Sequence, residues 1–388
     1  MKTIGIAALY LGTTIGLNSL AAGGASALSS VNTANVPPPS PYKVIETGPN
    51  HRIWQRETYE PMPGGQIATH IHSYTELASG LNYQDSTGKW VPSQAKIETF
   101  AGGAVARHGQ HQVIFANNLN TAGAIDEQTP DGKRLRSNIL GLMYFDPSTG
   151  QAVQIAQLQD SEGELIADDK VIYPNAFAGV QADVLFTYRL DGMEQDVILR
   201  EQPPTPEAYG MNPDTAELEV FTEFINPPTA NIMDLETDNQ ESDIDQAIGW
   251  GATSLGKGRA FSIGGEDVPA TVTKRYAIVN GRHFLLEKVK LQNIQQSLST
   301  LPQQSSNIRR LPGLASTHFK FPKGPSVKSV QRPMRLAQSP PANKGYVLDY
   351  VSLNASYTNF VFQGDTTYYI SGNINLVDTN FFEGGDCH

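Results

Sequence analysis

Cysteine is almost absent from this chain of 388 residues. The single cysteine, Cys387, lies next to the C-terminal residue, so no disulfide can form within the chain. Stability must therefore come from the burial of apolar side chains, and hydrophobic residues make up 39% of the sequence. No active-site pattern precedes Cys387, and we do not expect this thiol to be catalytic.

Positive charge is also scarce. The chain has 28 Lys and Arg against 39 Asp and Glu, which gives a formal net charge of −11. A chain this acidic is poorly suited to a phosphate backbone, so we expect no nucleic acid partner. The basic residues are unevenly spread, because residues 301–344 hold eight of them and no Asp or Glu. That stretch is rich in Pro, Ser and Gln and predicts a flexible basic linker.

Only one long apolar stretch occurs, over residues 4–20, and Gly, Thr and Asn interrupt it. Lys2 precedes this stretch and the small-x-small triplet Ala25-Ser26-Ala27 follows it. The pattern predicts a signal peptide over residues 1–27 that is cleaved on export. We therefore expect a secreted or cell-surface protein with no membrane span after cleavage.

Sustained helical periodicity is missing as well, and residues 293–301 are the best candidate for a short helix. Short alternating runs are instead separated by turn sequences such as Pro130-Asp131-Gly132. We expect an all-β protein made of antiparallel β-sandwich-like units. The expected order is a Pro-rich spacer (28–42), an antiparallel β domain (43–295) with a possible break near 202–215, a basic flexible linker (296–344) and a truncated β-solenoid start (345–388).

Two hairpins can be registered from the sequence. Asp191-Gly192 suits a two-residue type I′ turn. That turn would bury Val184, Phe186, Val197 and Leu199 on one face, with Phe186 opposite Val197, and would place the opposite-charge pairs Arg189–Glu194 and Asp183–Arg200 on the other face. Asn280-Gly281 predicts the second hairpin, in which Tyr276 pairs with Leu285 and Lys274 with Glu287.

Histidine offers one possible metal or catalytic group. His70 and His72 are two apart on an expected strand, so both imidazoles should project from one face about 7 Å apart at their Cα atoms. His108 and His111 lie in a Gly-containing stretch further along the chain. The four could be zinc ligands or could include the general base of a hydrolase. The alternative is polar decoration on the exposed face of a half-buried strand.

Two further segments bear on cofactors. The loop from Asp234 to Asp245 holds six carboxylates and could bind calcium, but it lacks the EF-hand spacing and glycine, which favours a solvated loop. Residues 251–257 resemble a phosphate-binding P-loop, but Gly258 stands where a magnesium-binding Ser or Thr is needed, so we expect a glycine-rich turn. No cofactor is therefore expected, with zinc and calcium left open.

Two stretches carry a resemblance to a known kind of protein. Residues 173–180 (YPNAFAGV) and 194–199 (EQDVIL), with residues 73–83, 107–111 and 129–133, resemble a module of very large secreted bacterial proteins. That module often precedes YD/Rhs-type repeats or β-solenoid repeats. Residues 362–372 (FQGDTTYYISG) and 382–385 look like the first rung of such a solenoid. The resemblance covers residues 53–225 and implies no activity, so no functional residue is carried over from it.

Three functions remain open at this point. The first is a non-catalytic extracellular surface or assembly module that presents or caps a larger repeat region, and this makes an enzyme the less favoured class. The second is a carbohydrate-active or metal-dependent hydrolase that uses the four histidines. The third is a β-sandwich module that binds an extracellular glycan through Trp54, Trp90 or Trp250. An exposed platform of Trp and Tyr side chains would favour this third function.

Overall fold

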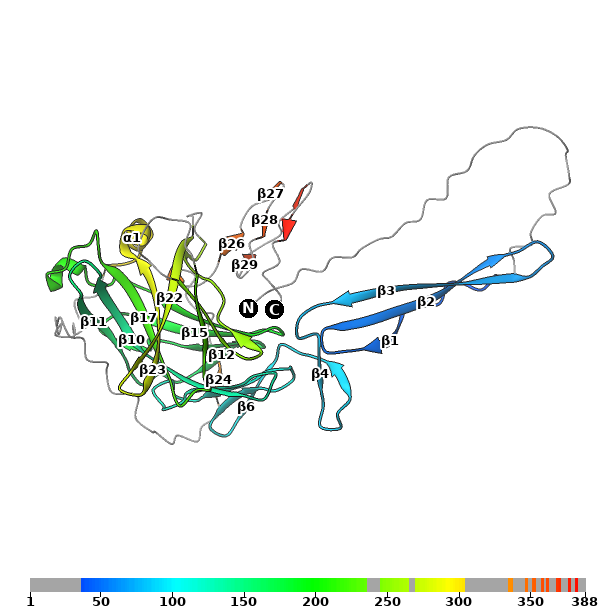
Figure 1. Cartoon of the computed structure of the whole chain (residues 1–388), viewed down its shortest axis with the longest axis horizontal. Coiled ribbons are helices and arrows are strands. Elements are labelled where there is room, and N and C mark those ends of the chain that lie inside the picture. Colours follow the sequence, from blue (N-terminus) through cyan, green and yellow to red (C-terminus); the bar gives the residue numbers. More distant parts are fainter. Residues whose placement is uncertain are drawn as a thin grey trace. The chain divides into compact units, whose positions relative to one another are not determined.

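The computed structural model describes residues 36–235, 245–264, 269–303 and 334–337, together with the backbone of seven short strands between residues 346 and 382. The expected signal peptide, the first part of the spacer, most of the basic linker and Cys387 lie outside the described residues. Strands dominate and are paired mainly in antiparallel sheets, so the predicted all-β, sandwich-like class is confirmed (Figure 1).

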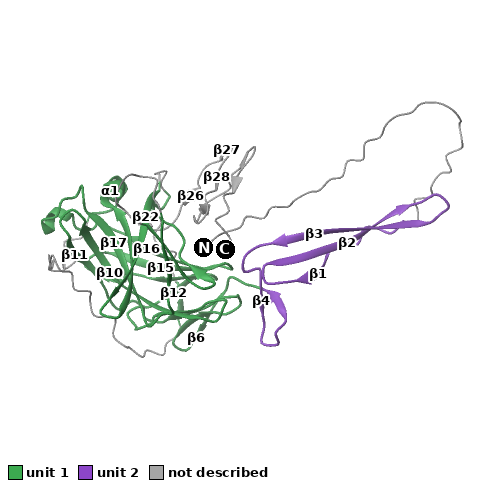
Figure 2. Ribbon diagram, viewed as in Figure 1, with its two compact units in different colours: residues 1–3, 93–388 green, residues 4–92 purple. Residues whose placement is uncertain are grey.

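The chain forms two compact units that meet in sequence at Pro92–Ser93 (Figure 2). The sequence suggested a break near residues 202–215 instead, and that stretch lies inside unit 1. Pro203, Pro204 and Pro206 are buried there, and the carbonyl of Pro204 accepts a hydrogen bond from the Tyr144 hydroxyl at 2.8 Å. The prolines end a strand without separating two domains, because they pack against the core of the same unit.

Unit 2 is built from a three-stranded antiparallel sheet and a small hairpin. Its strands are β1 (Lys43–Thr47), β2 (His51–Pro61), β3 (Ile67–Leu77), β4 (Asn82–Gln84) and β5 (Trp90–Pro92). β2 and β3 pair without interruption along their whole length, whereas β1 is bulged against β2 at Ile45. β1 and β3 are exposed along almost all of their length, so this sheet has two solvent-facing sides and no core of its own.

Unit 1 contains most of the strands. Its elements are β6 (Ile97–Phe100), β7 (Gly103–Ala106), β8 (Gln112–Ala116), β9 (Ile125–Gln128), β10 (Arg134–Asp146), β11 (Gln151–Leu158), β12 (Glu164–Ala167), β13 (Lys170–Tyr173), β14 (Phe177–Ala178), β15 (Ala182–Tyr188), β16 (Met193–Leu199), a 3-10 turn (Pro206–Tyr209), β17 (Glu217–Phe224), β18 (Asn231–Leu235), β19 (Asp245–Trp250), β20 (Thr253–Ser254), β21 (Gly258–Ser262), β22 (Ala270–Val279), β23 (Arg282–Lys290), α1 (Leu291–Ser299), β24 (Arg335–Leu336) and β25 (Tyr346–Val347). The short helix expected near residues 293–301 is α1, displaced by two residues.

The strands of unit 1 surround one large apolar core. One layer contains β9, β10, β17, β23 and β22 in that order, and another contains β12, β13, β15 and β16. β21 and β25 link the two layers through β22 and β16. In this core the ring of Phe186 lies about 6 Å, between ring centroids, from both Phe115 and Tyr173.

The β15–β16 hairpin differs from its sequence-based register by two residues. Phe186 pairs with Gln195 and Val184 with Val197, and the two-residue loop is Leu190-Asp191, closed by hydrogen bonds between Arg189 and Gly192. An even shift keeps every side chain on its predicted face, so the expected burial of Val184, Phe186, Val197 and Leu199 is confirmed. Both expected ion pairs also form, Arg189–Glu194 and Asp183–Arg200, each at 2.7 Å.

The second face of this hairpin is not a solvent face. Leu185 and Ile198 are buried there in a second apolar cluster with Ile172 and Phe261. β15 is consequently buried at every residue. The β22–β23 hairpin follows its predicted register, with Tyr276 opposite Leu285 and Lys274 opposite Glu287.

The C-terminal part departs from the expected flexible linker in one place. Met334 is buried in the core of unit 1, β24 pairs with β12, and Arg335 forms ion pairs with Glu162 and Glu164. Residues 334–337 are therefore anchored, and the rest of the basic stretch lies outside the described residues.

Six more short strands follow: β26 (Val351–Leu353), β27 (Tyr357–Thr358), β28 (Val361–Phe362), β29 (Tyr368–Ile370), β30 (Leu376–Val377) and β31 (Phe381–Phe382). Each of the first three pairs in parallel with a strand about 20 residues further along the chain, as successive rungs of a solenoid would. In the part of the chain that the structure describes, no helix has the length and apolar character needed to cross a membrane.

Candidate functional site

One face of the three-stranded sheet in unit 2 collects most of its distinctive side chains. The regular β2–β3 pairing sets Trp54 opposite Tyr74, Arg56 opposite His72 and Thr58 opposite His70. Side chains alternate along a strand, so all of these residues project from the same side of the sheet. We call this side the aromatic face; its members are Tyr42, Arg52, Trp54, Arg56, His70, His72, Tyr74 and Glu76.

Three aromatic rings form a continuous group on the aromatic face. The rings of Trp54 and Tyr74 are nearly parallel, with an interplanar angle of 9° and centroids 6.1 Å apart. Tyr42 meets Tyr74 edge-on at 5.0 Å, and the guanidinium of Arg56 lies 4.7 Å from the centre of the Tyr42 ring. Tyr42 is 36% exposed and Tyr74 47% exposed, whereas Trp54 is half-buried, so the two tyrosines form the part of this group that is open to solvent.

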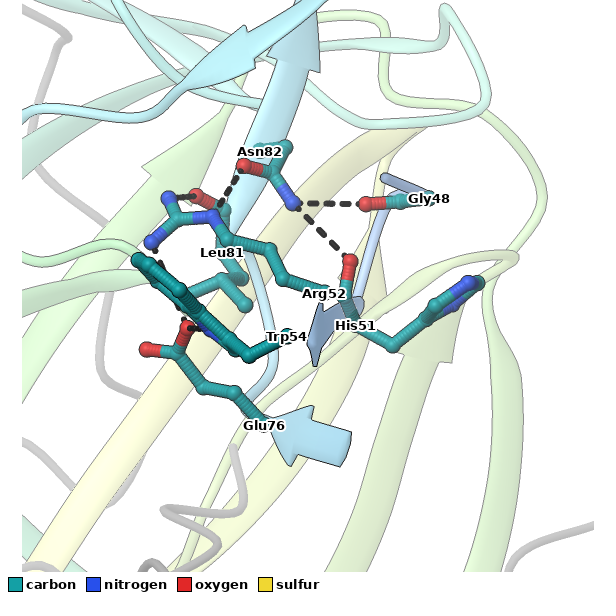
Figure 3. A network of polar contacts seen from close by, with 7 residues as sticks. All are labelled: Gly48, His51, Arg52, Trp54, Glu76, Leu81 and Asn82. Carbon is teal, nitrogen blue, oxygen red and sulfur yellow. Dashed lines mark hydrogen bonds and ion pairs between the residues drawn. The ribbon is translucent and has the colours of Figure 1, made fainter. Parts of the chain in front are cut away.

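A polar network holds Trp54 in place (Figure 3). Its indole nitrogen donates to Oε2 of Glu76 at 2.9 Å, and the same carboxylate pairs with Arg52 at 3.5 Å. Arg52 donates in turn to the side-chain oxygen of Asn82 at 2.9 Å and to the carbonyl of Leu81 at 3.2 Å. Asn82 is fully buried and donates to the carbonyl of Gly48 at 2.7 Å. The network therefore ties the base of the aromatic group to the turns on either side of it.

His70 and His72 project from the aromatic face as the sequence predicted, beyond the aromatic group. His70 contacts the Glu60 carboxylate at 3.0 Å, and His72 contacts the Thr58 hydroxyl at 2.8 Å. Both histidines thus have local partners on the exposed strand pair. This is the arrangement expected of polar decoration on a strand face.

His108 and His111 belong to unit 1 and have different environments. His108 contacts the Glu98 carboxylate at 3.3 Å. His111 is buried, its ring lies 4.6 Å from that of Tyr188, and it forms a hydrogen bond with the backbone of Gly192. Burial lowers the pKa of His111 from 6.5 to about 4, so its imidazole is neutral at physiological pH. His111 supports the turn of the β15–β16 hairpin.

The metal hypotheses gain no ligand set from the described residues, which contain no group of three or more His, Cys, Asp or Glu side chains able to hold an ion. A zinc site shared by all four histidines would need both units and stays a prediction. In the acidic loop, Asp234 accepts a hydrogen bond from Gln246, and Asp245 pairs with Lys274 at 3.4 Å. The other four carboxylates of that loop, and with them the calcium hypothesis, lie outside the described residues.

The three tryptophans named as possible glycan-binding residues are separated. Trp54 is on the aromatic face, Trp90 is half-buried on β5 opposite Gln84, and Trp250 is buried in unit 1 against Phe224 and Tyr276. Tyr42 and Tyr74 were missed by sequence reasoning. Tyr74 could have been found by pairing β2 with β3 around the Met62–Gln66 turn, whereas Tyr42 was assigned to the spacer.

No family model, no curated protein and no solved structure matches this chain.

Proposed function

We propose that this chain is a non-catalytic, extracellular surface module that binds an extended glycan along the aromatic face of unit 2. The observation that carries the proposal is the group of Tyr42, Trp54 and Tyr74 on one face of the sheet, in which both tyrosines are exposed and Trp54 is half-buried. Monomeric proteins rarely leave such apolar surface in solvent unless it binds something. Aromatic rings offer rigid apolar planes on which the C–H faces of sugar rings can stack.

The polar side chains around the rings suit the same ligand. Sugars present hydroxyl groups at the rim of an apolar ring face, and these need both donors and acceptors. Arg56 and the two histidines follow the aromatic group along β2 and β3 and can serve hydroxyls of an extended chain. The sheet is open on this side, which suits a long polymer better than a small enclosed ligand.

Preorganisation favours binding as well. The Glu76 bond to the Trp54 indole and the Arg52–Asn82 link hold Trp54 in one orientation before any ligand arrives. Less side-chain freedom is then lost on binding, which improves affinity.

Extracellular placement is supported by the signal-like N-terminal sequence and by the resemblance to modules of secreted bacterial proteins. The parallel strand pairs in the C-terminal part support the associated role of presenting or capping a repeat region. No contact of the described histidines favours the hydrolase, because each of them has a local structural partner.

The test is affinity electrophoresis of the full chain through gels that contain soluble polysaccharides such as xyloglucan, β-glucan or galactomannan. We expect retardation by at least one polymer, and the double substitution of Trp54 and Tyr74 by Ala should abolish it. Each lost stacking contact should weaken binding by roughly tenfold, given about 0.5–1.5 kcal/mol for the ring contact and more for its buried area.

Tyr59→Ala is the matched control, since Tyr59 projects from the opposite side of β2, where its hydroxyl donates to Glu57. It should leave retardation unchanged. Trp54→Phe keeps a ring but removes the Glu76 hydrogen bond, and it should give an intermediate effect. Equal loss of retardation in Tyr59→Ala and in the double variant would contradict a site on the aromatic face.

A further inference from the structure

Unit 1 contains a cavity of about 140 Å³ that plays no part in the proposed function of unit 2. Residues of β9, β10, β16, β17, β22 and β23 line it, together with Trp250 at the end of β19 and residues 253–257. The P-loop-like segment thus forms one wall of a cavity. Its size suits one small organic molecule or a few waters and not a polymer.

Three buried polar groups in the cavity wall lack a partner. The indole nitrogen of Trp250 and the hydroxyls of Thr222 and Thr253 form no hydrogen bond with any described residue. Trp250 is 1%, Thr222 2% and Thr253 7% exposed. Buried polar groups are almost always hydrogen-bonded, so three such groups around one cavity need polar partners, which water or a polar ligand can supply.

Two carboxyl groups reach the same cavity. Glu287 lies opposite Lys274, whose ammonium is 3.4 Å from Asp245, and the side chain of Glu127 has no hydrogen-bond or ion-pair partner among the described residues. Burial raises the pKa of both glutamates to about 7, and Lys274 partly offsets the shift at Glu287. Near neutral pH each carboxyl can therefore accept a hydrogen bond when ionised or donate one when protonated.

The charge of the wall excludes strongly charged ligands. Four acidic residues line the cavity against three basic ones, and Arg189 and Lys274 are already paired with Glu194 and Asp245. Glu127 and Glu287 are only partly ionised near neutral pH, so the wall carries little net charge there, and with Arg189 and Lys274 already paired it holds few free cations for a phosphate. A small cation would be repelled by the Lys274 ammonium. A neutral ligand with many hydroxyls avoids both conflicts, because each hydroxyl can donate to a carboxylate and accept from an N–H or O–H group.

We propose that this cavity binds a single neutral sugar unit. Its hydroxyls would accept from Trp250 and Lys274 and donate to Glu127 and Glu287, while Phe224 and Leu255 supply apolar contact. The inference does not rest on the glycan-binding role of unit 2, and either site can exist without the other.

Saturation-transfer difference NMR of the full chain with D-glucose, D-galactose, D-xylose and N-acetyl-D-glucosamine tests the proposal, with inorganic phosphate and ethylamine titrated as competing probes. We expect at least one sugar to bind. Thr253→Val keeps the shape and removes only the hydroxyl, whereas Trp250→Phe removes the indole N–H together with part of the ring, and each should lower affinity by about tenfold. Glu287→Gln should lower it by a similar factor above pH 7, where the carboxylate is the better acceptor.

Glu207→Gln, an exposed carboxylate elsewhere in unit 1, is the matched control and should have no effect. Trp54→Ala in unit 2 should also leave sugar binding intact, which separates this site from the aromatic face. Thermal melts show whether each variant is folded, and Thr253→Val carries the test if Trp250→Phe unfolds. The proposal is overturned if no sugar binds, if the cavity variants bind as the wild type does, or if phosphate or ethylamine binds in preference to every sugar.

Discussion

The β15–β16 and β22–β23 hairpins of unit 1 carry similar turn sequences, but their loops differ in position and in backbone conformation. At Asn280-Gly281 both residues adopt the left-handed backbone of a type I′ turn, with φ of 52° and 75°. At Asp191-Gly192 neither residue has a positive φ, and the loop moves back to Leu190-Asp191. The same dipeptide signal therefore located one turn correctly and misplaced the other.

The environment of each turn explains the difference. The β22–β23 turn is open to solvent, as the 61% exposure of Ile278 beside it shows, so local backbone preference decides its geometry. The β15–β16 turn is held by tertiary contacts. Arg189 pairs with both Asp191 and Glu194, and the buried His111 ring bonds the Gly192 backbone. Local preference of about 1 kcal/mol is easily outweighed by such contacts.

The largest expected contrast is in the stability that each hairpin loses when one of its apolar side chains is truncated. Phe186→Ala should lower the free energy of unfolding by ~3–5 kcal/mol, because the ring is fully buried in the main core. Ile278→Ala, in the other hairpin, should change it by less than about 0.5 kcal/mol. Urea denaturation of both variants measures the contrast. Similar losses would mean that the two hairpins are equally buried.

The second expected contrast is in how protein stability depends on pH. His111 is neutral in the fold because burial lowers its pKa to about 4, whereas the unfolded chain binds a proton near pH 6.5. The unfolded state therefore gains protons first as the pH falls, and stability should decrease between pH 6.5 and pH 4 by up to about 3 kcal/mol from this group.

Urea denaturation of the wild type and His111→Gln at pH 7, 5.5 and 4 measures this contribution as the change in their stability difference. The glutamates of the cavity titrate in the same range but are common to both proteins, so their effects cancel. His70→Gln, at an exposed histidine of unit 2, is the control for a general effect of replacing a histidine by glutamine. A wild-type profile in His111→Gln would contradict a neutral, buried His111.

The smallest contrast concerns the two turn glycines. Gly281→Ala should cost ~1 kcal/mol, because its φ of 75° is unfavourable for any residue with a Cβ atom. Gly192→Ala should cost less, since Gly192 does not use the left-handed region. Thermal denaturation of the two single variants distinguishes them. A larger loss in Gly192→Ala would show that the sequence-based turn at Asp191-Gly192 forms after all.

For the candidate sites, sequence reasoning found single residues but not their grouping. Trp54 was named, and His70 and His72 were placed on one strand face, because alternation along a strand is a local property. Tyr42 and Tyr74 join Trp54 only through pairing with two other strands. The cavity of unit 1 was beyond reach, because Glu127, Thr222, Trp250 and Glu287 come from four separate elements.

The sequence by itself determined the all-β class, the faces of both hairpins, the register at Asn280-Gly281 and the position of α1 to within two residues. These depend on side-chain period and on turn chemistry, which act over a few neighbouring residues. Tertiary structure alone decided the division at Pro92–Ser93, the two-residue shift of β15–β16 and the anchoring of Met334. Those outcomes depend on contacts between residues far apart in the chain, whose combined free energy exceeds any local preference.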